Sequence, residues 1–143
     1  MADFNKFQQF VGDLGLGVHN LNTGTLNIYL SNTAPSAADD AVKGDLAEIS
    51  TGGGYSGPQD TQNSYAESGG TGTLTGTAVT ITATSGGVAQ FRYVVLYNDT
   101  PSSPADPLIG WWDRGSALDL AEGDSFTWKP NNSDTTGTIL TIA

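Results

Sequence analysis

The chain has 143 residues, among them 19 glycines, one histidine and no cysteine, and 15 acidic against five basic side chains give a formal net charge of −10. This length fits a single domain with its own core, and the lack of cysteine excludes disulfides and thiolate metal sites. The acidity argues against binding to nucleic-acid phosphates or to an anionic membrane surface, because both require clustered Lys and Arg.

The first expected element is a helix over residues 3–18. Apolar residues recur there at spacings of three and four, as on one face of a helix: Phe4, Phe7, Val11, Leu14 and Val18. Three glycines between residues 12 and 17 oppose it, since each costs ~1 kcal/mol relative to alanine in a helix interior. The apolar face packs either on the chain's own sheet or on a neighbouring copy. Phe4, Phe7 and Val11 are therefore interface candidates.

Residues 25–31 alternate between apolar and polar side chains, which indicates a half-buried strand. Residues 42–49 are short and mixed, and they suit one helical turn that Leu46 and Ile49 anchor to the core.

Residues 50–72 form a Gly-rich stretch with almost no aliphatic side chain but with two tyrosines, Tyr55 and Tyr65. A loop of this length is uncommon in a compact domain unless it is functional or disordered. The stretch is either mobile or an extended arm ordered on another subunit, and a short strand around residues 59–66 also suits its threonines and tyrosine. We take Tyr55 and Tyr65 as further interface candidates.

The main run of strands is expected in residues 73–143. Residues 73–84 alternate, with Val79, Ile81 and Ala83 facing inward. Further strands are expected at these positions: 89–98, 108–113, 118–120, 125–129 and 138–142.

The strand at residues 89–98 is apolar on both faces, so it is expected near the middle of a sheet that is covered on both sides. Strict alternation places Phe91 on the same face as Tyr93 and Val95. In the next strand Trp111 and Trp112 are adjacent, so their side chains point to opposite faces. One belongs to the core and the other faces a second layer, a partner or water, and both are interface candidates.

Many short strands with turns between them, and no alternation of strand and helix, predict a mainly β protein. We expect an antiparallel β-sandwich, jelly-roll-like, with one short N-terminal helix.

No catalytic or metal site is predicted, and no cofactor. His19 is the only histidine, and it follows a glycine-broken helix. The chain has no GxSxG-type sequence of the kind that surrounds a hydrolase nucleophile. It is better explained as a surface or helix-end residue. The acidic residues near 98–106 and at 39–40 do not follow a calcium-loop pattern. Exposed aromatic rings could alternatively stack on sugars.

Three segments, DLAEISTGGGY, FRYVVLYNDT and LIGWWD followed by LAEGDSF, carry a resemblance that extends along nearly the whole chain. With the Phe-rich start and LNIYLSNTAP, they resemble a group of small virion proteins of tailed bacteriophages. The resemblance implies a cement or decoration protein that binds the outside of the capsid as a homo-oligomer. It maps no contact residue onto this chain.

The resemblance therefore leads us to expect a non-enzymatic structural protein, with the major capsid protein and further copies of itself (a homodimer or homotrimer) as partners, and neither nucleic acid nor membrane. The expected location is the capsid exterior after synthesis in the host cytoplasm, since MADFNKFQQF lacks the features of a signal peptide. The alternative is a receptor- or glycan-binding β-sandwich module of a phage tail or head fibre.

Overall fold

The computed structural model describes residues 3–143. Within them the chain is mainly β, with one short α-helix and two 3-10 turns. The elements in chain order are β1 (Phe4–Lys6), α1 (Gln8–Gly15), β2 (Leu26–Ser31), η1 (Lys43–Asp45), β3 (Gln59–Asp60), β4 (Ser64–Ser68), β5 (Thr71–Thr77), β6 (Val79–Thr82), β7 (Val88–Asn98), β8 (Leu108–Leu120), β9 (Ser125–Trp128), η2 (Pro130–Asn132) and β10 (Thr136–Ile142).

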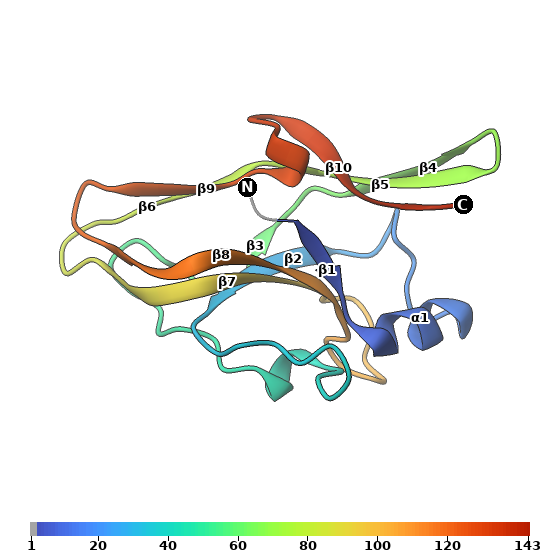
Figure 1. Cartoon of the computed structure of the whole chain (residues 1–143), viewed down its shortest axis with the longest axis horizontal. Coiled ribbons are helices and arrows are strands. Elements are labelled where there is room, and N and C mark those ends of the chain that lie inside the picture. The colour runs from blue at the N-terminus through green and yellow to red at the C-terminus, as the bar shows by residue number, and fades with distance from the viewer. Residues whose placement is uncertain (1–2) are drawn as a thin grey trace.

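The strands form two layers, which Figure 1 shows one above the other. The lower layer is a five-stranded sheet in the order β1-β8-β7-β2-β3, and the upper layer combines the sheet β10-β5-β4 with the ribbon β6-β9. All pairings are antiparallel. The expected mainly β, antiparallel, sandwich-like fold with one short helix is thus confirmed.

Strand β7 lies in the middle of the lower sheet, between β8 and β2, and is covered on both faces as its sequence predicts. Val94 and Leu96 face the core between the layers. Tyr93, Val95 and Tyr97 form a second buried cluster on the opposite face. The segment that leads through η1 covers this cluster and inserts Leu46 into it, as the anchored turn predicted for residues 42–49 requires.

The prediction that Phe91 shares a face with Tyr93 is wrong. Phe91 packs in the core between the layers, with Val94. The pairing with β8 shifts between Phe91 and Tyr93, because Phe91 lies opposite Leu118 whereas Tyr93 lies opposite Asp113. A register irregularity of this kind changes which residues face inward. The two short strands expected at 108–113 and 118–120 are in fact parts of one long strand, β8.

The N-terminal helix is shorter than predicted. Residues 4–6 form an edge strand, β1, in which Phe4 lies opposite Trp112 and Lys6 opposite Gly110. Phe7 is extended, with φ −73° and ψ 143°, and its N–H donates to the Ile109 carbonyl at 3.1 Å. Sheet pairing therefore satisfies backbone groups that a helix starting at residue 3 would have used, and the helix begins only at Gln8.

The Gly-rich stretch 50–72 is not a structureless arm. Tyr55 is 2% exposed, and a Cβ on Gly53 would overlap the backbone of Gly87, so this part of the chain packs tightly on the turn before β7. The strand predicted around 59–66 is split into β3 and β4, because Thr61 crosses between the layers. Its N–H donates to the Leu26 carbonyl and its own carbonyl accepts from Thr77.

Candidate interaction surface

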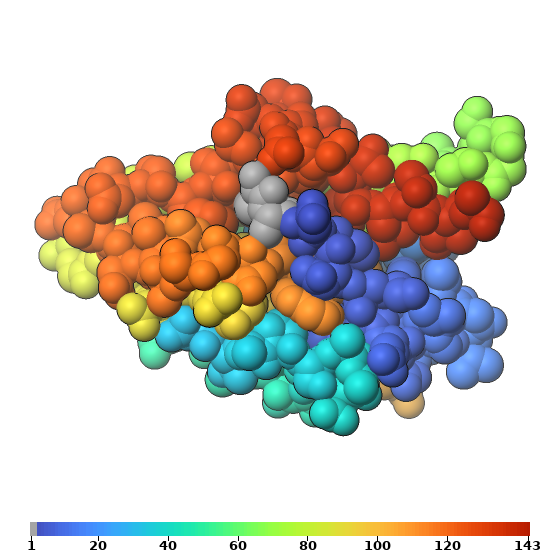
Figure 2. Space-filling view, viewed as in Figure 1, coloured from blue at the N-terminus to red at the C-terminus, as the bar shows by residue number. Residues whose placement is uncertain are grey.

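The two layers leave a groove on the side where β1 of the lower sheet faces β10 of the upper sheet. Figure 2 shows the N-terminal residues in blue directly beneath the red C-terminal strand on this side. We call the hollow between them the edge groove. Its volume is about 420 Å³, and its lining residues are Phe4, Lys6, Phe10, Val11, Leu14, Leu140, Thr141 and Ile142.

Helix α1 forms the floor of the edge groove with side chains of two kinds. Phe10 is buried in the core, whereas Val11 is 54% exposed. Leu16, which ends the helix as its C-cap, is 82% exposed. An eight-residue helix that buries only part of its apolar face thus leaves large aliphatic side chains in contact with solvent.

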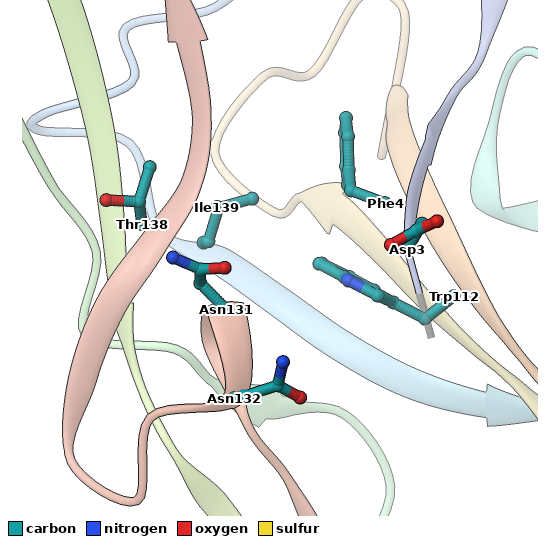
Figure 3. A pocket seen from close by; sticks show the side chains of 7 residues that line it. All are labelled: Asp3, Phe4, Trp112, Asn131, Asn132, Thr138 and Ile139. Atoms are coloured by element: carbon teal, nitrogen blue, oxygen red, sulfur yellow. The ribbon is translucent and has the colours of Figure 1, made fainter. Parts of the chain in front are cut away.

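At one end the edge groove continues into a smaller polar hollow of about 100 Å³. Phe4 lines both hollows. Figure 3 shows Asn131 and Asn132 on one side of this hollow, with Asp3 and Trp112 on the other. Asn131 and Asn132 have φ values of 48° and 59°, a left-handed conformation that asparagine tolerates better than most residues.

At the other end lies a hollow of about 490 Å³, which we call the end hollow. It shares Leu14 and Ile142 with the edge groove. Its remaining lining comes from the segment after α1 and from β4: Gly17, His19, Asn20, Leu21, Asn22 and Tyr65. The three hollows together follow β10 and α1 along one side and one end of the molecule.

The interface candidates are divided by this geometry. Val11 and the half-buried Phe4 line the edge groove, and the half-buried Tyr65 lines the end hollow. Phe7, Tyr55 and Trp112 lie inside the protomer, with exposures of 0%, 2% and 3%, so their side chains offer no surface to a partner.

Trp111 and Trp112 point to opposite faces of β8, as their adjacency predicts. Trp112 packs in the core against Phe4 and Trp128, with ring centroids at 5.3 and 5.2 Å. Trp111 lies on the outer face, half-buried, with its ring 4.6 Å from that of Phe7. The N-terminal segment of the same protomer therefore covers much of Trp111.

Leu16, Leu140 and Ile142 were not among the interface candidates that the sequence predicts. Leu16 does not follow the helical spacing of three and four. An apolar residue away from the buried face of a helix is expected to be exposed, so its position could have indicated a surface residue. The aliphatic residues of β10 looked like core, because the sequence does not reveal that this strand lies at an edge.

His19 is buried rather than at the surface, with 7% of its area exposed. Its Nδ1 lies 3.2 Å from the Asn98 side-chain amide, and its ring is 5.2 Å from that of Phe10. Burial lowers the pKa of His19, and the nearby Asp13 carboxylate partly opposes that effect. The residue anchors the chain after α1 to the end of β7.

Comparison with known proteins gives no relative: no family model, no curated protein and no solved structure matches this chain. Among residues 3–143, His, Asp and Glu side chains nowhere form a group of three or more that could hold a metal ion. In the same part of the chain, none of the helices is long and apolar enough to cross a membrane.

Proposed function

We propose that this protein is a non-enzymatic structural protein of a tailed-phage virion, a cement or decoration protein that binds the major capsid protein on the outer surface of the shell. The observation that carries the proposal is the exposed apolar surface of α1 and its C-cap: Val11 is 54% exposed and lines the edge groove, and Leu16, directly before the hollow-lining Gly17, is 82% exposed. Exposed aliphatic side chains next to a concave surface are typical of protein contact sites. The sequence resemblance supplies the identity of the partner.

The contact with the shell is assigned to the end hollow and Leu16. Leu16 ends the helix and directly precedes Gly17, which lines this hollow together with the half-buried Tyr65 and Ile142. One such contact is small. Many copies that bridge neighbouring capsid subunits would nevertheless hold the shell strongly, because each further contact is made at high effective concentration.

The net charge of −10 suits this role. It keeps the free protein soluble, and it directs binding to protein rather than to the packaged nucleic acid. The glycan-binding alternative requires exposed aromatic rings for stacking. Four of the five candidate rings, Trp112, Trp128, Tyr93 and Tyr97, are at least 92% buried, with 3%, 0%, 8% and 3% of their areas exposed. Only Trp111 stays half-buried, and its ring packs on Phe7. One partly covered ring supports a sugar-stacking site poorly, which favours the cement function.

The proposal is tested by co-sedimentation of the purified protein with capsids that lack it. Leu16→Glu places a charge on the apolar contact and is expected to reduce binding about tenfold or more, a typical effect for a residue at the centre of an interface. Ala121→Glu adds the same charge at an exposed position in the turn between β8 and β9, at the opposite end of the molecule, and should bind like wild type. Equal binding by both variants would contradict the assigned surface, and no binding by wild type would contradict the function.

A further inference from the structure

The smallest of the three hollows, which we call the polar hollow, brings together polar side chains from three separate segments of the chain. They are Asp3 before β1, Asn131 and Asn132 in η2, and Thr138 in β10. The volume of the polar hollow is about 100 Å³. A single ordered water requires only ~10–15 Å³ of such space, so the polar hollow has room for a larger group.

The ring of Trp112 forms one wall of the polar hollow. Figure 3 shows this ring in the space between Asp3 and Asn131. Trp112 is 3% exposed, and its indole N–H has no hydrogen-bond acceptor in the part of the chain that the structure describes. The indole N–H of Trp128 is sealed in the core, whereas that of Trp112 keeps access to the hollow that its ring lines. Because a buried indole N–H normally has a partner, this one indicates a ligand atom that accepts a hydrogen bond.

Asp3 and Asn131 add the complementary groups. Within residues 3–143 the Asp3 carboxylate forms neither an ion pair nor a hydrogen bond, and the Asn131 side-chain amide has no partner either. An ionised carboxylate only accepts hydrogen bonds, an indole N–H only donates, and an amide does both. The polar hollow therefore presents a free donor and a free acceptor side by side.

This combination selects a ligand by its charge. A cation would face the donor N–H of Trp112, and an anion would face the Asp3 carboxylate in a protein with a net charge of −10. A hydroxyl group is neutral, and it can donate to a carboxylate while it accepts from an N–H. We infer that the polar hollow binds two neighbouring hydroxyl groups of a sugar or polyol. One hydroxyl lies between Asp3 and the Trp112 N–H, and the other bonds to the Asn131 amide.

The loop that carries Asn131 is already fixed without a ligand. The Ser133 hydroxyl donates to the Thr136 carbonyl at 3.0 Å, and the Ser133 N–H donates to the Pro130 carbonyl at 3.0 Å. These bonds fasten η2 to the start of β10. A loop that is ordered in advance loses little conformational entropy on binding, which favours recognition of a small ligand.

The polar hollow lies at the opposite end of the edge groove from the end hollow, to which the shell contact is assigned. The inference therefore does not rest on the proposed function, and both surfaces can be used at once. It also requires no stacked ring, since only the edge of the indole takes part. The burial of the tryptophan rings, which disfavours a sugar-stacking site, is compatible with it.

NMR spectroscopy of the free protein tests the inference, because three tryptophans give three indole N–H signals. The probes are glycerol and methyl α-mannopyranoside, which carry neighbouring hydroxyls, and for comparison sodium acetate, ammonium chloride and acetamide. Each is added to about 50 mM, because ligands of this size bind with a Kd on the order of millimolar. The expected result is a saturable shift of the Trp112 signal with the two hydroxylated probes alone, while the Trp111 and Trp128 signals stay in place.

Each other outcome overturns the inference. A saturable shift with acetate or ammonium in place of the hydroxylated probes would contradict the selection by charge. A shift with acetamide alone would assign the polar hollow to an amide side chain of a protein partner. No saturable shift with any probe would mean that it holds water only. Failure to bind capsids would leave these results unchanged, so the two proposals fail separately.

A glycine substitution tests the role of Asn131. Its φ of 48° is left-handed, so Asn131→Gly removes the amide and keeps a backbone conformation that glycine adopts readily. The affinity for the hydroxylated probes should fall about three- to tenfold, the range for one lost hydrogen bond. Gln62→Gly is the matched control, because Gln62 is exposed, has a φ of 50° and lies outside the lining of the polar hollow. Equal affinity of the two variants would show that Asn131 does not bind the hydroxyls.

Discussion

The hydroxyl of Tyr55 donates a hydrogen bond to Glu48 Oε2 at 2.6 Å, and it accepts another from the Leu30 backbone N–H at 3.2 Å. Glu48 in turn accepts from Lys43 Nζ through Oε1 at 2.8 Å. This chain of bonds fastens the loop after η1 to β2 in the lower sheet. A tyrosine from the Gly-rich stretch thereby becomes part of the core.

Replacing Tyr55 by phenylalanine should lower the free energy of unfolding by about 1–3 kcal/mol. The change removes only the hydroxyl, but it leaves the Leu30 N–H and one Glu48 oxygen without their partner. Tyr65→Phe is the matched control, because Tyr65 is half-buried and its hydroxyl makes no hydrogen bond in the described structure. Urea unfolding of both variants checks the prediction, and equal midpoints would show that the Tyr55 bonds contribute nothing.

The sequence predicts the layers of this fold better than its ends. The sequence of β7 is apolar on both faces and correctly indicates a central strand covered on both sides, because each buried face requires apolar side chains. The start of the chain is wrongly predicted as helix. Phe4 and Phe7 fit a helical spacing as well as they fit a strand followed by a bend. Only pairing with β8, far away in sequence, decides between them.

The candidate surface could be predicted only in part. Val11 was recognised from its place on an apolar helix face, and its exposure follows from the shortness of α1. The edge groove depends on β1 and β10 coming together from opposite ends of the chain. No local pattern reports that contact or the edge position of β10, so Leu140 and Ile142 were indistinguishable from core residues.

The close approach of β1 to β8 predicts a large effect of one methyl group. A Cβ on Gly110 would overlap the Phe4 ring and the Asn5 carbonyl, which belong to the neighbouring strand. Gly110→Ala should therefore displace β1 and destabilise the protein by about 1–3 kcal/mol, the usual range for overpacking. Thermal unfolding measures this loss, and a stability equal to wild type would show that β1 does not dock as described.

A glycine in α1 should respond in the opposite direction. Gly12 lies inside the helix, and a Cβ there would have as its nearest neighbour the Gln9 side-chain nitrogen at 3.5 Å, an ordinary contact. Gly12→Ala is expected to raise the free energy of unfolding by about 0.5–1 kcal/mol through helix propensity. Gly17→Ala is the contrasting variant, because its φ of 79° strains any side chain and should cost stability. Thermal unfolding ranks the two, and the reverse order would contradict the helix boundaries.

The buried His19 gives the fold a dependence on pH between 7.5 and 5.5. Burial lowers the pKa of His19 in the folded protein below its ordinary 6.5, so the unfolded chain binds the proton more readily. Stability should therefore fall as the pH drops through about 6.5, with a slope no steeper than about 1.4 kcal/mol per pH unit for one proton. Asp45 and Asp113, whose pKa values are lowered by hydrogen bonds, lose their contributions only below about pH 3.8.

Urea unfolding of wild type and His19→Gln across this range isolates the histidine. Glutamine cannot be protonated, yet its side-chain oxygen can still accept from the Asn98 amide, which now lies 3.2 Å from His19 Nδ1. The variant's free energy of unfolding should be lower than that of wild type by a roughly constant amount. It should also change much less with pH between 7.5 and 5.5. A wild-type profile as flat as that of the variant would show that His19 titrates alike in the folded and unfolded chains. A profile that rises toward pH 5.5 would mean that attraction by Asp13 outweighs burial.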